Sequence, residues 1–193
     1  MIYTKFKIEE IKKELESCLT EERYIHSIGV MEMAEILAKR FSCDVQKAKF
    51  AGLLHDCAKC LSKEESLKYT DCLLECELPS LKTWHAPIGR FIAKNKYGID
   101  DEEILNAIRW HTVGRINMSD FEKIIYLADK IELRTREKQF REKIETALDN
   151  RNNLDDAMLM SFKLTIKSLI ERNLPICSHT IDIYNDLLKK FEV

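Results

Sequence analysis

The chain has 193 residues, a formal net charge of −2 and a sequence pI near 6.2. This length predicts one domain with a sizeable buried core. The near-neutral balance argues against a nucleic acid polymer held mainly by phosphate contacts, because such a partner requires a broad basic surface, whereas a small anionic substrate requires only local cations.

The sequence predicts an all-α fold. It contains only 5 glycines and 3 prolines and has almost no alternating apolar pattern, so we expect helices joined by short loops. In chain order, the expected helices are residues 8–18, 21–40, 45–58, 63–76, 84–96, 101–112, 120–131, 137–148, 154–172 and 179–191.

Two helix starts have the spacing of a capping box, in which a hydroxyl and a carboxylate each satisfy a backbone N–H. These are Ser62 with Glu65 and Ser119 with Glu122. The polar run at residues 149–153 is interpreted as a loop that precedes two C-terminal helices.

The chain shows no sign of export or of membrane insertion. No apolar run approaches the roughly 18 residues of a membrane span, and residues 1–20 are a charged amphipathic segment without a signal-peptide core. The 7 cysteines are an odd number without framework spacing, which is typical of a reducing compartment. Cys57 and Cys60 are interpreted as small core residues. We therefore expect a cytoplasmic protein with no membrane partner.

Four of the 5 histidines form an ordered series with two aspartates. Neutral imidazole nitrogens and carboxylate oxygens are ligands for divalent transition metals, and this set is too large for one closed structural zinc site. The long gaps between its members mean that the ligands must come from several helices, which predicts a centre for one or two metals in a helical core. The series is His26, His55, Asp56, His85, His111 and Asp129.

Apolar neighbours at helical spacing support core positions for the members of the series. His26 is followed by Val30 on the same helical face, and Asp129 lies four residues after Ile125. An unpaired carboxylate on such a buried face would cost several kcal/mol. A lone histidine in this setting is usually an ordinary core residue, but the complete pattern favours metal binding. His179 lies outside the series and is expected at the surface or at a helix cap.

The residues from about 26 to 136 resemble the HD superfamily of metal-dependent phosphohydrolases. The likeness consists of the order H…HD…H…H…D, with Lys59 three residues after the HD aspartate, and of the short sequence segments around each ligand. The matching segments are RYIHSIGV at 23–30, LHDCAK at 54–59, HAPIG at 85–89, IRWHTVG at 108–114 and LADKIE at 127–132. Within the superfamily they are similar to the YqeK family of bacterial hydrolases, which cleave diadenosine tetraphosphate symmetrically into two ADP.

The resemblance implies a helical HD-domain bundle with a dinuclear metal site in its core. Iron is the first candidate, and manganese, nickel and zinc are alternatives. By this likeness, His26, His55, Asp56 and Asp129 would hold one metal, and Asp56, His85 and His111 would hold the second. We expect residues 1–193 to form a single HD-type domain, with a ligand-bearing core at about 20–148 and the helices of 154–193 packed on it.

The expected reaction uses a metal-activated hydroxide. Two metals bridged by Asp56 would lower the pKa of a shared water, and Lys59 would stabilise the charge that develops on the phosphoryl oxygens. Asp56 and Lys59 are therefore the expected catalytic residues. The expected substrate-binding residues are Lys59, Thr112, Gly114, Arg115 and Arg136. The chain departs from the usual A-D-x-I-E-P-x-R wording, because Leu133 stands in place of the proline.

Other interpretations stay open. The enzymatic alternative is an HD-type phosphohydrolase that acts on a nucleoside monophosphate, a guanosine alarmone or a cyclic dinucleotide, since fold alone does not settle the substrate. A non-catalytic nucleotide-binding regulator would be expected to have lost ligands or Lys59, and neither loss has occurred. A homodimer through the C-terminal helices is a further alternative.

Overall fold

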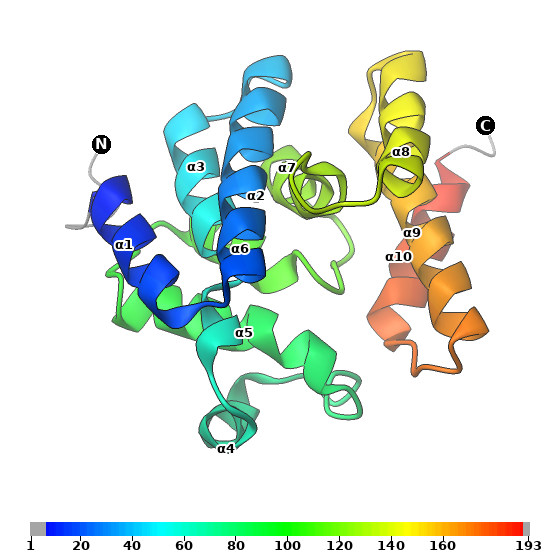
Figure 1. The fold of residues 1–193 in the computed structure, drawn as a ribbon. Coiled ribbons are helices and arrows are strands. Elements are labelled where there is room, and N and C mark those ends of the chain that lie inside the picture. Colours follow the sequence, from blue (N-terminus) through cyan, green and yellow to red (C-terminus); the bar gives the residue numbers. More distant parts are fainter. Residues whose placement is uncertain (1–6, 191–193) are drawn as a thin grey trace.

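Helices account for all the regular secondary structure in the residues that the structure describes. A computed structural model covers the chain and describes residues 7–190, in which no strand is present (Figure 1). This confirms the all-α prediction. The α-helices are α1 (Ile8–Cys18), α2 (Glu21–Arg40), α3 (Val45–Leu54), α4 (Lys63–Ser66), α5 (Leu81–Asn95), α6 (Glu102–Trp110), α7 (Asp120–Ile131), α8 (Lys138–Arg151), α9 (Leu154–Glu171) and α10 (Ser178–Lys189).

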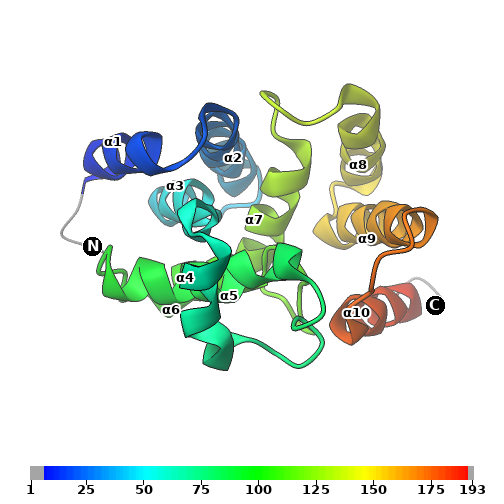
Figure 2. The same cartoon turned by 60° about the horizontal axis from the view of Figure 1, so that its bottom comes forward.

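Helix α7 lies between the two sides of the molecule. On one side, α2 packs along α3 and both contact α7, while α5 and α6 pack together below them; on the other side, α8, α9 and α10 follow one another (Figures 1 and 2). One continuous apolar core joins the two sides, with Leu54 of α3, Ile125 of α7 and Phe162 of α9 among its fully buried members. No helix in residues 7–190 has the length and apolar character needed to cross a membrane.

Both predicted capping boxes are confirmed. Ser119 Oγ accepts from Glu122 N at 3.2 Å, and Glu122 Oε2 accepts from Ser119 N at 2.7 Å. Ser62 and Glu65 make the same pair of bonds. The bounds of α1, α2 and α7 agree with the sequence, and most other bounds differ by less than one turn. The expected end of the last helix, at residue 191, lies outside the described residues.

Helix α3 ends earlier than predicted. It stops at Leu54, and the chain then turns at Asp56 (φ −105°, ψ 14°) into a short 3₁₀ helix, Cys57–Cys60. Adjacent residues of an α-helix do not face the same way. The break lets the neighbouring His55 and Asp56 both face the middle of the molecule, which a helix over residues 45–58 would have prevented.

The single helix predicted at residues 63–76 is also wrong. Helix α4 ends at Ser66, and the chain continues as a 3₁₀ helix, Leu67–Cys72, in which Tyr69 has non-helical angles (φ −118°, ψ 18°). Tyr69 and Leu73 pack against a small apolar cluster that contains Trp84 of α5. This tertiary packing overrides the local helical pattern, and short 3₁₀ pieces are common in such connectors.

The loop predicted at residues 149–153 shrinks to two residues. Helix α8 continues to Arg151, Asn152 ends it in the left-handed conformation (φ 49°), and Asn153 caps α9 by accepting from Asp155 N at 2.8 Å. Asparagine tolerates the left-handed region better than most residues. The polar run is therefore a tight turn between α8 and α9.

A buried ion pair and a disulfide hold the segment that precedes α5. The Arg109 guanidinium donates two bonds of 2.9 Å to the Glu77 carboxylate, which also accepts from Leu74 N at 2.8 Å. Cys76 forms a disulfide with Cys177, with 5.0 Å between the Cα atoms. The spacing of the cysteines, which lacks the pattern of a disulfide framework, did not predict this bond. Cys57 and Cys60 do lie in or against the core, as predicted.

Candidate metal centre

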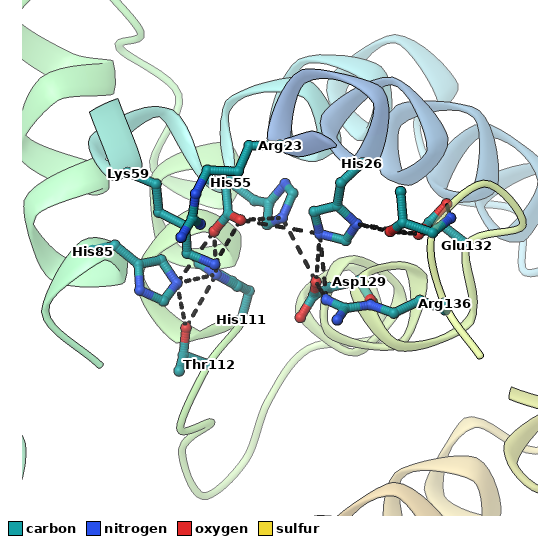
Figure 3. Close-up of polar contacts among 12 residues, drawn as sticks. Arg23, His26, His55, Lys59, His85, His111, Thr112, Asp129, Glu132 and Arg136 are labelled. Atoms are coloured by element: carbon teal, nitrogen blue, oxygen red, sulfur yellow. Dashed lines mark hydrogen bonds and ion pairs between the residues drawn. The ribbon is translucent and has the colours of Figure 1, made fainter. Parts of the chain in front are cut away.

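All members of the histidine and aspartate series come together in the helical core (Figure 3). Each is buried, with exposed fractions between 0% and 9%. Two groups have ligand atoms within 4.8 Å of one another: His26, His55 and Asp129, and His55, Asp56 and His111. His85 on α5 completes the cluster, because its Nε2 lies 3.0 Å from His111 Nε2.

Asp56 lies between two halves of this cluster, one with His26 and His55 and the other with His85 and His111. Its Oδ2 lies 3.5 Å from His55 Nε2 and 4.0 Å from His26 Nε2. Its Oδ1 lies 3.2 Å from His85 Nε2 and 3.5 Å from His111 Nε2. Each carboxylate oxygen therefore faces a different pair of imidazoles, which is the arrangement of a carboxylate that bridges two sites.

Asp129 belongs to one half only. Its Oδ1 lies 2.9 Å from His26 Nε2 and 3.7 Å from His55 Nε2. Lys130 Nζ lies 2.9 Å from its Oδ2, and Arg136 also pairs with the carboxylate. Arg136, an expected substrate-binding residue, thus reaches the cluster by pairing with an expected ligand.

Backbone carbonyls fix the tautomers of two histidines. His55 Nδ1 lies 2.7 Å from Gly52 O, and His111 Nδ1 lies 2.7 Å from Ile108 O. A carbonyl can only accept, so in each ring Nδ1 carries the proton and donates it, and the lone pair of Nε2 points into the cluster. Metal-binding histidines commonly have such a partner on the other nitrogen.

Several buried polar atoms in the cluster lack a hydrogen bond. His55 Nε2 and both Asp56 oxygens are buried without one, although Lys59 Nζ forms an ion pair with Asp56 Oδ2 at 2.7 Å. Orphaned buried polar atoms are rare and costly. His85 Nε2 and His111 Nε2 also face each other closely, and Thr112 Oγ1 lies 3.1 Å and 3.0 Å from them. A divalent metal satisfies such a donor set, and the residues present fit one.

The protonation states also suit metal binding. Burial lowers the pKa of His55 to about 3 and holds the pKa of His85 well below its usual value. Burial opposes ionisation of Asp56, but the adjacent imidazoles and Lys59 outweigh it and keep the pKa of the carboxyl well below its usual value. For Asp129, Lys130 and Arg136 outweigh burial in the same way. Neutral imidazoles and ionised carboxylates are the forms that bind metals.

Glu132 supports His26 and was not selected from the sequence. Its Oε1 lies 3.2 Å from His26 Nδ1, and its carboxylate accepts from Arg134 N and Thr135 N. Burial opposes the charge of Glu132, but these bonds lower its pKa to about 2. A Cβ on Gly29 would collide with the Glu132 carboxylate, so this glycine permits the close approach. The signal was the final E of LADKIE, three residues after Asp129.

The same carboxylate closes the turn in which Leu133 replaces the usual proline. Backbone N–H groups of Arg134 and Thr135 converge on Glu132, at 2.6 Å and 2.9 Å, while the Leu133 side chain stays exposed. A proline is therefore not needed to form this turn. The chain then returns to the cluster at Arg136.

Gly114 and Arg115 do not reach the cluster. Gly114 adopts a left-handed conformation (φ +74°) and packs so that a Cβ would meet Ile183 and Phe162 at 2.9 Å and 3.0 Å. Arg115 donates two bonds of 2.9 Å to Glu122. These contacts give both residues structural roles and lend no support to the predicted substrate contacts. His179 is half-buried in the first turn of α10 and stacks on Trp110.

A cavity of about 470 Å³ adjoins the cluster. His85 and Lys59 line it, together with Arg23 of α2, Lys63 of α4 and Lys82 of α5, and no acidic residue lines it. Figure 3 shows the Arg23 side chain extending from α2 toward Lys59. The arrangement as a whole can hold divalent metal in the core and attract an anion beside it.

Comparisons with known proteins agree with this geometry. The model of the HD domain family matches residues 23–134. A symmetrical bis(5'-nucleosyl)-tetraphosphatase of Halalkalibacterium halodurans is 42% identical over 185 residues, covering 88% of this chain and 91% of that protein. The enzyme of the same name from Bacillus subtilis is 40% identical over 176 residues, again covering 88% and 91%. The crystal structure of a predicted HD superfamily hydrolase involved in NAD metabolism, from Clostridium acetobutylicum, superposes with a TM-score of 0.88 at 40% identity, covering 96% of this chain and 98% of that one.

Proposed function

This chain belongs to the HD domain family, and from its identity to named relatives we infer that it is a symmetrical bis(5'-nucleosyl)-tetraphosphatase. The enzyme hydrolyses diadenosine tetraphosphate at its central bridge and releases two ADP. The observation that carries this conclusion is the 42% identity to a protein of that name across 88% of the chain. The buried His and Asp cluster supplies the matching chemistry.

The cofactor is a divalent metal, and we propose two ions, with iron as the first candidate. His26, His55, Asp56 and Asp129 would hold one ion, and Asp56, His85 and His111 would hold the other. The position of Asp56, with one oxygen facing each pair of imidazoles, supports this division. Bound divalent metal would supply Lewis acidity that withdraws charge from phosphoryl oxygens and lowers the pKa of water.

Direct attack by water is the proposed chemistry, and the nearest thiol is not available to replace it. Cys57 is the nearest thiol along the chain, but it is buried, donates to Gly89 O and has a pKa raised by burial, so it stays protonated. A protonated thiol is a poor nucleophile. Thr112 Oγ1 lies between His85 and His111 and can orient a bound water or phosphoryl oxygen by hydrogen bonding.

Lys59 has the position expected of a residue that binds the phosphoryl group. Its side chain is 26% exposed, its Nζ lies 2.7 Å from Asp56 Oδ2, and it lines the adjoining cavity. It can therefore contact substrate in the cavity while it keeps its ion pair with Asp56. A lysine in this place stabilises negative charge that grows on the phosphoryl oxygens during attack.

Product analysis tests the proposed function. Protein purified without oxygen and loaded with iron or manganese is incubated with diadenosine tetraphosphate, and the nucleotides are separated by chromatography. ADP as the sole product is the expected result. ATP with AMP would overturn the symmetrical cleavage, and an unchanged substrate in the presence of metal-loaded protein would overturn the activity.

A further inference from the structure

The cavity beside the metal centre continues directly from the expected ligands. Lys59 and His85 line the cavity, and both contact the Asp56 carboxylate, at 2.7 Å and 3.2 Å. A phosphoryl group at the cluster would therefore have its next phosphate at the mouth of this cavity. The rest of a polyphosphate substrate must leave the cluster by such an opening.

The cavity wall carries positive charge that the protein does not neutralise. Arg23, Lys63 and Lys82 line it, and within residues 7–190 no carboxylate lies in ion-pair distance of any of them. Some basic side chains elsewhere are paired, as Lys123 is with Asp120 and Asp155, but the three at the cavity also share one wall with no acidic residue among its described lining residues. Clustered cations without counter-charges repel one another and attract an anion. The electrostatics of this wall therefore suit an anionic ligand such as a phosphate.

The three cations come from three separate elements. Arg23 lies in the first turn of α2, Lys63 begins α4 and Lys82 lies in the first turn of α5. Figure 2 shows α4 crossing over α5, and the two helices are in contact. The tertiary fold therefore gathers the charges into one wall, which no local run of basic residues could do.

The size and remaining lining of the cavity fit one nucleotide. Its volume of about 470 Å³ lies in the lower half of the range of about 300–1,000 Å³ that is usual for one drug-sized ligand. A whole dinucleotide is too large for it. Leu61 and Leu81 give the same wall apolar surface, and Leu81 is 49% exposed. Apolar surface beside a few cations suits a nucleoside attached to phosphates.

We propose that this cavity is the subsite for one nucleoside diphosphate half of the substrate, with Arg23, Lys63 and Lys82 binding its phosphates. The inference rests on the proposed function and adds the place of half the substrate. It makes Lys63 and Lys82 specificity residues, which hold the polyphosphate in register with the cluster. The same residues bind the ADP that remains after cleavage.

Steady-state kinetics of Lys63→Ala, Lys82→Ala and the double variant test the subsite. Each change is expected to raise the KM for diadenosine tetraphosphate about tenfold, the size of one charge-assisted hydrogen bond, while kcat stays within about twofold. The inhibition constant for ADP should rise in parallel. Lys94→Ala is the matched control, because Lys94 lies on α5 like Lys82, is 53% exposed and faces Glu102 instead of the cavity.

Two other results would overturn the subsite. An unchanged KM and ADP inhibition in the double variant would place the substrate elsewhere, and a loss of kcat at constant KM would make the lysines part of the chemistry instead. Calorimetric titration of metal-loaded protein with ADP separates this inference from the proposed function. If the wild type binds ADP more tightly than the double variant but cleaves no dinucleotide, the subsite is supported and the proposed function is overturned.

Discussion

Two buried groups of charged residues in this protein differ in how completely their atoms are satisfied. In the Glu77–Arg109 pair, two hydrogen bonds of 2.9 Å join the side chains, and Leu74 N donates a further bond to one oxygen of the Glu77 carboxylate. In the metal-centre cluster, His55 Nε2 and both Asp56 oxygens are buried without a hydrogen bond. Buried charge alone therefore does not mark a functional site, whereas several unsatisfied imidazole and carboxylate atoms that converge on one point, as they do here, indicate a site that binds a ligand.

Loss of Asp56 should have the largest effect, because this residue serves both halves of the cluster. Asp56→Ala is expected to lower kcat by more than about 10³-fold, or roughly 4 kcal/mol, and to remove most bound metal. Turnover and metal content by mass spectrometry are the measurements, and circular dichroism checks that the helices remain. An Asp56→Ala variant that keeps its bound metal and its turnover would show that the unsatisfied atoms of the cluster do not mark the metal centre.

Loss of Glu77 should act on stability and leave the metal in place. Removing one partner of a buried ion pair costs about 3–5 kcal/mol, because the other charge stays buried without compensation. We expect Glu77→Ala to lose that much free energy of unfolding in urea, with unchanged metal per folded molecule. Glu75→Ala, at an exposed neighbouring position, is the control. Metal loss without destabilisation would assign Glu77 to the centre instead.

Metal removal should destabilise the wild type, because the metal that stabilises the folded protein binds at the cluster. A metal at 100 times its dissociation constant adds about 2.7 kcal/mol of stability by mass action. Chelation should therefore lower the melting temperature of the wild type, reversibly, and leave Asp56→Ala almost unchanged. An equal shift in both proteins would place the stabilising metal somewhere other than this cluster.

Glu132 should show the smallest effect, because it acts through His26. Residues that orient a metal-binding histidine typically contribute about 10–100-fold to metal affinity. Glu132→Gln is expected to weaken metal binding by that factor, measured by competition with a chelator, while Gln at the exposed Glu137 has no effect. Unchanged affinity in Glu132→Gln would reduce its role to closing the turn before Arg136.

The sequence predicted the features that depend on local patterns and missed those that depend on distant parts of the chain. His26, His55 and Asp129 follow a pattern of spacing and apolar neighbours, so the cluster was visible without coordinates. The bounds of α7 were predictable because Ser119 and Glu122 cap it locally. Residues 63–76 were misassigned because packing against α5, which lies further along the chain, decides their conformation.

Partners that are distant in the sequence stayed hidden. Glu77 and Arg109 are ordinary charged residues in the sequence, and only the fold brings them together. The ion pair of Arg115 with Glu122 was equally hidden in the sequence, in which Arg115 was expected to bind substrate. Spacing reveals residues that share one chemistry, but it does not reveal which unlike residues will meet.

The disulfide between Cys76 and Cys177 has a consequence for the covalent topology of the site. It closes a ring of chain between positions 101 residues apart, and His85, His111 and Asp129 lie within that ring, whereas His26, His55 and Asp56 lie on the tail outside it. A protease that cuts once inside the ring therefore releases no fragment. The nicked molecule would migrate as one species until a reductant opens the bond, and all of the expected ligands would stay on one covalent body.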